Sequence, residues 1–326
     1  MTPARQPLPL VAVGHVTLDR VGERKVLGGS AWYAASAWRA LGEQVRLITA
    51  AGPELPPFAP WRGLNVELRR AQRTTEFSNL HEGGGSRRLI LHGQACPLPP
   101  LGQGPPCDVL FLAPVLGEVP LEAWRRATDA RLIGAGLQGW LKQAGPDGEV
   151  VARPDLIDPT SFEGVDVACL SEEDLAGDDG WLARLAEVVP VVALTLAERG
   201  CELICRGAPS VRVPTPEARS VDPTGAGDAF AAGLLRAIAR GASPLEAASA
   251  AVALGAAAVE HVGAPPVGAV RAADCLEHHP GERAHGWQHV DAPVGGDEGG
   301  QGAPAVPQPA EEEADHQDGQ PGAQHN

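Results

Sequence analysis

The chain has 326 residues, 44% of them hydrophobic, which is enough to bury a sizeable core as one large α/β domain or two smaller ones. Its formal net charge is −15, and Lys and Arg do not cluster anywhere, which excludes a nucleic-acid partner because phosphate backbones require clustered cations. No apolar run is long enough to span a bilayer, and no N-terminal segment has the form of a secretion signal. These features predict a cytoplasmic protein without a membrane partner.

Much of the negative charge lies at the C-terminus. Residues 280–326 carry nine carboxylates against one arginine, Arg283, and so contribute −8 of the −15. This segment consists mainly of Gly, Pro, Gln, Ala and acid without periodicity, so it cannot bury enough apolar surface to offset the cost of ordering. We predict a folded domain over residues 1–279 and a disordered acidic tail over residues 280–326.

Strands and helices are predicted to alternate along the folded part. The predicted strands cover residues 8–14, 45–51, 109–113, 131–135, 165–170, 191–196 and 201–205. The predicted helices cover residues 31–41, 121–128, 180–188, 227–240 and 244–261. Alternation at this spacing indicates an α/β fold in which a mostly parallel central sheet carries helices on both faces.

Two helix starts can be predicted from capping residues. Ser243-Pro244-Leu245-Glu246 is a capping box with proline at the first helical position. Ser30 is able to cap the first turn of the helix over residues 31–41, and Gly42 follows that helix in the position where chains often turn left-handed.

Residues 64–92 have a different character. Residues 64–68, 76–80 and 88–92 alternate between polar and apolar, and a glycine-rich turn over residues 82–86 joins the last two. We predict a hairpin over about residues 64–92 that lies against the main sheet.

Six cysteines are scattered without the spacing of a zinc site, which favours reduced thiols. Cys201 and Cys205 lie four residues apart on a predicted strand and would face the same side, which leaves a metal or redox role as an alternative.

The segment from Asp222 to Phe230, Asp-Pro-Thr-Gly-Ala-Gly-Asp-Ala-Phe, delivers a glycine-rich turn into a helix. The first-turn amides of Gly225, Ala226 and Gly227 have no partners within the helix and carry the positive end of its dipole, which suits a phosphoryl group. This is neither a P-loop nor a dinucleotide-binding motif, because Phe230 takes the place of a third glycine.

Asp228 is unusual in this position, because a carboxylate repels the phosphate that it adjoins. It makes chemical sense as a general base that accepts the proton of an attacking hydroxyl while the amides stabilise charge on the phosphoryl oxygens. The alternative is that Asp228 merely caps the helix and the glycines only form a turn.

The segment Asp222 to Phe230 resembles the C-terminal signature of the ribokinase-like (PfkB) sugar kinase family, and Gly28-Gly29 resembles its other signature. The resemblance extends over residues 8–279. It implies a ribokinase-like sandwich with a small β lid and the phosphorylation of a hydroxyl by ATP. It also implies that Asp228 is the base, that Gly225, Ala226 and Gly227 form the anion hole, and that Asp19, Gly28 and Gly29 hold substrate hydroxyls.

The same resemblance implies the nucleotide and cation sites. The loop containing Thr195, Arg199 and Gly200 resembles the nucleotide loop, although Ala197 replaces a usual glycine; the remaining implied nucleotide contacts are Thr224, Gly225 and Gly227. Asp222 and Thr224, with the loop around Gly263, lie where many members hold a monovalent cation such as K⁺. Ser171 and Asp174 occupy the place of the family's Asn-x-x-Glu, and these shorter side chains would reach Mg²⁺ through water.

Substrate choice is expected to differ from that of ribokinase. Tyr33 stands where ribokinase presents an Asn to the sugar, and it either stacks against a substrate ring or packs its own helix. Only residues 20–27 separate Asp19 from Gly28, which predicts a reduced lid supplied mainly by residues 64–92. Dimerisation through the lid is then doubtful, so both monomer and dimer remain open.

The short lid, the segment Thr74 to Asn79 and the segment Val259 to Gly263 resemble the myo-inositol kinase branch of the family. We therefore predict an ATP- and Mg²⁺-dependent kinase for a small sugar or polyol, with an inositol-like ring favoured. One alternative is a nucleoside kinase, which would need a lid that stacks on a base. Another is a non-catalytic sugar sensor, which the changes at Ser171, Asp174 and Ala197 would allow.

Overall fold

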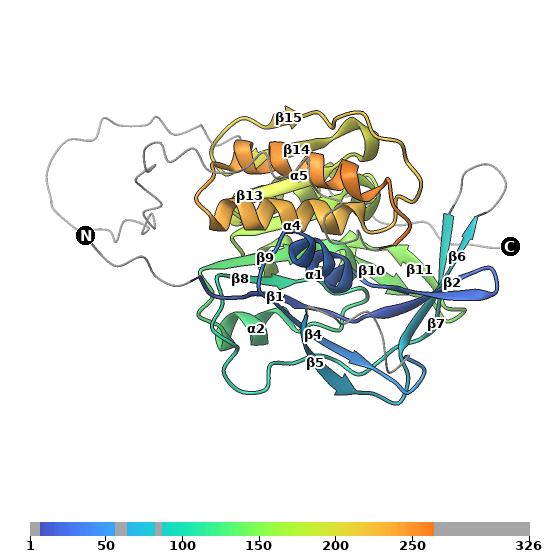
Figure 1. Cartoon of the computed structure of the whole chain (residues 1–326). Helices are drawn as coiled ribbons and strands as arrows, with labels where there is room; N and C mark the ends of the chain where they lie inside the picture. The colour runs from blue at the N-terminus through green and yellow to red at the C-terminus, as the bar shows by residue number, and fades with distance from the viewer. Residues whose placement is uncertain (1–6, 56–63, 82–86, 264–326) are drawn as a thin grey trace, which may run out of the picture. The chain divides into compact units, whose positions relative to one another are not determined.

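The computed structural model describes residues 7–55, 64–81 and 87–263 (Figure 1). The turn predicted over residues 82–86 and the tail predicted over residues 280–326 lie outside these residues. Within them, two sheets and five α-helices form the fold. None of the helices in the described ranges is long and apolar enough to cross a membrane.

Nine strands form the large sheet of the described chain, in the order β15-β14-β13-β12-β9-β8-β1-β4-β5. Their bounds are β1 Leu10–Val13, β4 Val45–Ala51, β5 Asn65–Arg70, β8 Val109–Leu112, β9 Leu132–Gly136, β12 Val167–Ser171, β13 Val191–Thr195, β14 Cys201–Cys205 and β15 Val211–Val213. Neighbouring strands run parallel from β5 to β13, whereas β14 and β15 are antiparallel. The predicted parallel-centred sheet is confirmed.

Helices cover both faces of this sheet. One face carries α1 (Ser30–Ala40), α4 (Ala226–Ala239) and α5 (Pro244–Ala258), and the other carries α2 (Leu121–Ala127) and α3 (Asp179–Val188). Because side chains alternate along a strand, β1 sends Ala12 into the first layer and Val11 and Val13 into the second. Such strands are apolar throughout, as the sequence pattern predicts.

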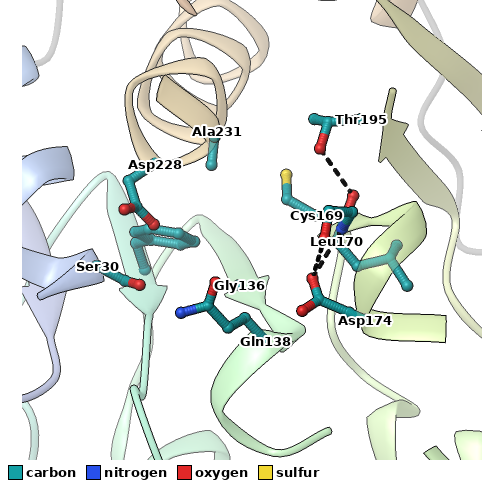
Figure 2. Close-up of a pocket in the computed structure, with 12 residues that line it drawn as sticks. Ser30, Gly136, Gln138, Cys169, Leu170, Asp174, Thr195, Asp228 and Ala231 are labelled. Carbon is teal, nitrogen blue, oxygen red and sulfur yellow. Dashed lines mark hydrogen bonds between the residues drawn. The ribbon is translucent and has the colours of Figure 1, made fainter. Parts of the chain in front are cut away.

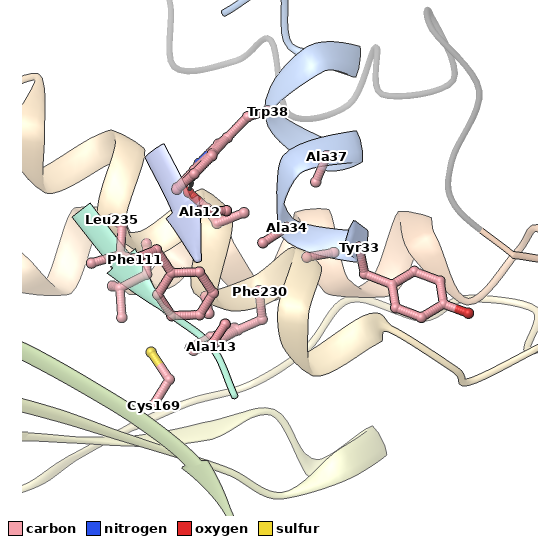
Figure 3. Close-up of a cluster of buried hydrophobic side chains, with 14 of the residues drawn as sticks. Ala12, Tyr33, Ala34, Ala37, Trp38, Phe111, Ala113, Cys169, Phe230 and Leu235 are labelled. Carbon is pink, nitrogen blue, oxygen red and sulfur yellow. Dashed lines mark hydrogen bonds between the residues drawn. The ribbon is translucent and has the colours of Figure 1, made fainter. Parts of the chain in front are cut away.

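Close contacts fix α1, α4 and α5 to one another. The indole Nε1 of Trp38 in α1 donates to the carbonyl of Ala232 in α4 at 2.8 Å, and its ring packs edge-on against Phe111 (Figure 3). Gly233 lets α5 approach, because a Cβ there would lie 3.1 Å from Cδ2 of Leu254. These contacts hold the start of α4 in a fixed position.

The capping box at Ser243 is confirmed, since Ser243 and Glu246 exchange hydrogen bonds at the start of α5. The predicted cap at Ser30 is wrong. Gly29 is the N-cap of α1, with φ of 103°, and Ser30 is the first helical residue. Glycine is required at position 29 because a Cβ there would overlap the carbonyl oxygen of His15. Ser30 therefore does not cap the helix.

The second sheet, which we call the lid, has the strand order β10-β11-β7-β6-β2-β3 in the part of the chain that the structure describes. Its strands are β2 Thr17–Val21, β3 Arg24–Gly28, β6 Thr75–His81, β7 Arg87–Gly93, β10 Lys142–Ala144 and β11 Glu149–Ala152. The predicted antiparallel pairing of the second and third segments of residues 64–92 is confirmed by β6 and β7.

Two expectations about the lid are wrong. Residues 17–28 do supply two lid strands, because Asp19 and Gly28 lie within the strands of a tight hairpin rather than flanking it. The first segment of the predicted hairpin, residues 64–68, instead belongs to β5, which pairs parallel with β4 in the large sheet. An edge strand with one exposed face alternates in the same way as a lid strand, so the pattern cannot tell the two apart.

A buried polar cluster lies where the lid leaves the large sheet. The imidazole Nδ1 of His15 lies 2.8 Å from Oγ1 of Thr75, at the start of β6. The amide of His15 donates to the carboxylate of Glu118 at 2.9 Å, and this carboxylate also accepts from the amide of Val115. These bonds satisfy polar groups that are buried beside the carboxyl ends of β1 and β8, and they fix the base of the lid there.

Candidate active site

A cavity lies at the carboxyl ends of the central parallel strands, which is where ligands bind in open α/β sheets (Figure 2). Gly136 ends β9, Ser171 ends β12 and Thr195 ends β13. The start of α4 closes the cavity opposite these strands. The lining residues are Ser30, Phe111, Gly136, Gln138, Cys169, Leu170, Ser171, Asp174, Thr195, Gly227, Asp228 and Ala231.

The glycine-rich turn leads into α4 as the sequence predicts, but one of the three amides named for the anion hole is not free. Gly225 is the N-cap and adopts φ of 82°, in the left-handed region, and a Cβ there would overlap the ring of Tyr33. Gly227 lines the cavity, whereas the amide of Ala226 donates to the carbonyl of Pro223 at 3.3 Å. The amide of Ala226 is therefore already engaged in this turn.

Asp228 lies in the first turn of α4 and lines the cavity. Its carboxylate faces the hydroxyl of Ser30 at the start of α1 (Figure 2), and the interaction with this hydroxyl lowers the pKa of Asp228. Removal from water raises the pKa of Asp228 to about 7, with a smaller increase from Asp174; the Ser30 hydrogen bond and the charge of Lys142 oppose this increase. A carboxyl group with this pKa can exchange a proton near neutral pH.

Asp174 lies in the short 3₁₀ helix Glu172–Leu175, which follows β12. Its Oδ2 accepts hydrogen bonds from the amide and the hydroxyl of Ser171, at 2.9 and 2.7 Å. Its Oδ1 is buried without a hydrogen-bond partner, and Nζ of Lys142 lies 3.4 Å away. The predicted pair of Ser171 and Asp174 is thus brought together in the cavity, with one carboxylate oxygen free of hydrogen bonds.

The predicted nucleotide loop divides between the cavity and the surface. Thr195 lines the cavity, and its hydroxyl donates to the carbonyl of Leu170 at 3.3 Å. Arg199 is exposed and forms an ion pair with Glu172. Ala197 adopts φ of 52°, a left-handed conformation that favours glycine, the residue that the family resemblance implies at this position. Gly200 follows at φ of 88°.

Asp222 links the loop before α4 to the loop after α5. Its Oδ1 accepts from the amide of Thr224 at 3.0 Å, and its Oδ2 accepts from the amide of Gly263 at 3.3 Å. The residues named for a monovalent cation therefore converge, although the carboxylate already has backbone partners.

The residues named for substrate hydroxyls lie beside the cavity and not in its lining. Asp19 in β2 accepts from the hydroxyl of Thr17 at 2.9 Å and lies against Gly28. Gly29 then leads directly into Ser30, which contacts Asp228. Tyr33 is 5% exposed, packs against Gly225 and points away from Phe111 and Cys169 (Figure 3). This placement favours the interpretation in which Tyr33 packs its helix.

Three residues of this site were missed in the sequence. Ser30 was interpreted as a cap, and Gln138 and Lys142 lie in a segment for which the pattern predicted no element. The amide of Gln138 projects into the cavity between Ser30 and Asp174 (Figure 2). No local signal marks these residues, because their role depends on the neighbours that the fold brings to them.

The described cysteines, Cys96, Cys107, Cys169, Cys201 and Cys205, are free thiols. Burial raises the pKa of Cys201 to about 11 and that of Cys107 to about 12, so both are protonated at neutral pH. Among the described residues no group of three or more His, Cys, Asp or Glu side chains is placed to hold a metal.

Comparison with known proteins gives a consistent result. Residues 121–267 match the profile of the pfkB family carbohydrate kinase. A cytidine kinase of Thermococcus kodakarensis is 27% identical over 268 residues, which are 73% of this chain and 91% of the relative. A pyrophosphate-dependent kinase of the ribokinase family, solved with a pyrophosphate analogue and myo-inositol, is 19% identical with a TM-score of 0.68, over 80% of this chain and 98% of the other. Ribokinase of Arabidopsis thaliana, solved with ribose and ATP, is 19% identical with a TM-score of 0.60, over 82% of this chain and 99% of the other.

Residues 121–267 therefore carry a pfkB family carbohydrate kinase domain, and the fold of the chain is that of the ribokinase-family kinases. Together these findings support a carbohydrate kinase.

Proposed function

We propose that the protein transfers the γ-phosphoryl group of ATP to a hydroxyl of a small sugar or polyol, with a myo-inositol-like ring as the favoured acceptor. The observation that carries this proposal is Asp228. It lies at the start of α4, lines the cavity beside Ser30, and has a pKa raised to about 7. A base with this pKa beside a helix N-terminus suits proton removal from an alcohol next to a phosphoryl group.

In the proposed reaction, the acceptor oxygen forms a bond to the γ-phosphorus while the bond between this phosphorus and the bridging oxygen of ADP breaks. The electron pair of the broken bond leaves with ADP. Asp228 takes the hydroxyl proton, and the hydrogen bond from Ser30 orients its carboxylate. The amides of Gly225 and Gly227, with the dipole of α4, stabilise charge on the transferred oxygens.

Magnesium fits the cavity through Asp174. The buried Oδ1 of this residue has no hydrogen-bond partner, and a single carboxylate with water and phosphate oxygens is a common set of magnesium ligands. Bound there with the nucleotide, Mg²⁺ would neutralise phosphate charge. Ser171 would act only through Asp174, because its hydroxyl already donates to that carboxylate. A monovalent cation such as K⁺ at Asp222 and Thr224 belongs to the same proposal.

The lid supports a polyol over a nucleoside. Phe77 is the one Phe, Tyr or Trp among the described lid strands, and it is 5% exposed. It packs with Val115 and Val150, so its ring is not available to stack on a base. The polar groups near the base are Asp19 and the backbone at Gly28 and Gly29, which suit the hydroxyls of a small ring.

A nucleoside kinase is the second candidate, because the cytidine kinase matches 73% of this chain. Pyrophosphate is an alternative donor, because structures of a pyrophosphate-dependent kinase share the fold with a TM-score of 0.69. The activity assay therefore includes nucleosides as acceptors and pyrophosphate as a donor.

The test combines donors and acceptors. The protein is incubated with Mg²⁺ and either ATP or pyrophosphate, together with myo-inositol, ribose, other polyols, cytidine or inosine, and the formation of phosphorylated acceptor is measured. We expect turnover with ATP and a polyol. Turnover with nucleosides alone would replace the polyol proposal, and no turnover with any pair would indicate a sugar sensor.

Replacing the base tests the mechanism. Asp228→Asn should lower kcat by about 10²–10⁴-fold, because the amide keeps the shape of the carboxylate but cannot accept the proton. Affinity for ATP, measured by calorimetry, should change little. Unchanged turnover in Asp228→Asn would mean that this residue only supports the helix start.

A further inference from the structure

A segment between the two sheets places a cation beside Asp174, which lines the cavity. Residues 136–142 run from the end of β9 in the large sheet, through the 3₁₀ turn Leu137–Gly139, to the start of β10 in the lid. Gly136 and Gln138 line the cavity, and Lys142 follows as the first residue of β10. The side chain of Lys142 is 20% exposed, so most of it is buried.

The ion pair of Lys142 with Asp174 is loose. Its N–O distance is 3.4 Å, longer than the 2.7–2.9 Å that is usual for charge-assisted hydrogen bonds, and Oδ1 of Asp174 accepts no hydrogen bond. The other oxygen of Asp174 is fully used by Ser171. An ammonium group held in this way keeps donor capacity for another partner.

Lys142 also acts on the base. Its charge lowers the pKa of Asp228, which shows that the ammonium group lies within electrostatic range of both carboxylates that line the cavity. A phosphoryl group placed between the start of α4 and Asp174 would therefore come under the same positive charge. Its oxygens carry more negative charge than one carboxylate, so they compete for the ammonium group.

We propose that Lys142 is a catalytic residue: its ammonium group gives up the ion pair with Asp174 and binds the oxygens of the γ-phosphoryl group. The assignment rests on the proposed kinase function. Lys142 remains protonated throughout the transfer and forms no bond to phosphorus. It neutralises the charge on the transferred oxygens while the acceptor bond forms and the bond to ADP breaks.

The competing interpretation is structural, namely that Lys142 only neutralises buried Asp174. Two readouts distinguish the interpretations. If Lys142 serves only Asp174, then Lys142→Met should lower the melting temperature and adding Asp174→Asn should restore it, because no uncompensated buried charge remains. If Lys142 binds the phosphoryl group, Lys142→Met should also lose affinity for a nucleotide that carries this group, and Lys142→Arg should keep that affinity.

The main readout is nucleotide binding without acceptor. Dissociation constants for ADP and for a non-hydrolysable ATP analogue with an imido bridge are measured by calorimetry with Mg²⁺. In Lys142→Met, the affinity for the analogue relative to ADP should fall by about tenfold or more, as expected when a charge-assisted contact to one phosphate is lost. Lys142→Arg should retain most of that preference.

Lys25→Met is the matched control, because Lys25 is a lid lysine that pairs with Glu76 on the surface and lies outside the cavity. Lys25→Met should leave the affinity for the analogue relative to ADP unchanged. In the turnover assay, kcat of Lys142→Met should fall by about 10²–10³-fold.

An unchanged ratio in Lys142→Met would overturn the assignment even if the enzyme phosphorylates polyols. Failure of every acceptor would overturn the proposed function but leave the binding result interpretable. If Lys142→Met does not fold, Lys142→Gln takes its place, because its amide keeps hydrogen-bond donors without the charge, and it should show the same loss of preference for the analogue. Absence of nucleotide binding by the unaltered protein would overturn both.

Discussion

Asp228 has a carboxyl pKa raised to about 7, because the surrounding protein removes it from water. Below that pH the carboxyl is mostly protonated and cannot accept the proton of a hydroxyl. We therefore expect kcat/KM for the acceptor to rise about tenfold per pH unit up to about pH 7 and then to level off. The measurement is initial rates with saturating ATP between about pH 5 and 9.

Ser30→Ala provides the paired variant for this pH profile. The hydrogen bond from Ser30 lowers the pKa of Asp228, so its removal should move the acid limb to higher pH. A profile that is flat from pH 5 to 8 in the unaltered protein would exclude a base with this pKa.

At the scale of the residue, the sequence identified Asp228 because a carboxylate next to free helix amides is chemically unusual. It did not identify the partners of Asp228. Ser30 lies far away along the chain, and its position at the start of a helix has a common capping interpretation. Lys142 is an ordinary lysine in sequence and gains its role only from Asp174.

At the scale of the element, the turn into α4 depends on Gly225. Alanine there would combine a left-handed φ of 82° with overlap of its Cβ and the Tyr33 ring. We expect Gly225→Ala to lower the free energy of unfolding by about 2–4 kcal/mol and to abolish turnover, because the start of α4 must shift. The check is denaturant unfolding together with the kinase assay.

Gly227→Ala is the matched control for Gly225→Ala. A Cβ at Gly227 meets nothing within 4 Å, and alanine favours the helix, so stability should be kept or increased. Its activity should nevertheless fall, because the added methyl group enters the cavity that Gly227 lines. Equal stability of Gly225→Ala and the unaltered protein would contradict the argument from Tyr33.

The sequence predicted most elements of the large sheet and its helices, because apolar runs, caps and glycines act over a few neighbouring residues. It failed where the same local pattern fits two places. The alternation in β5 suits an edge strand of the large sheet as well as a lid strand. The strands β2, β3, β10 and β11 are short and carry charged residues, so their stability comes from the neighbours with which they pair.

At the scale of the whole molecule, the composition of residues 280–326 predicts a segment that adds no core. A chain that ends at residue 279 should therefore melt within about 2 °C of the full chain and keep the same kcat and KM. Differential scanning calorimetry and the kinase assay provide the comparison. A decrease in melting temperature of more than about 5 °C would show that these residues pack against the domain.

The sequence by itself determined the class of chemistry and the α/β architecture. Both are encoded in contiguous residues, from Asp222 to Phe230 and in the alternation of strands and helices. The tertiary structure decided which strands form the lid, how Ser30 meets Asp228, and how Lys142 reaches Asp174. These features depend on pairing and burial between segments that are distant in the chain, and no local pattern of residue types specifies such contacts.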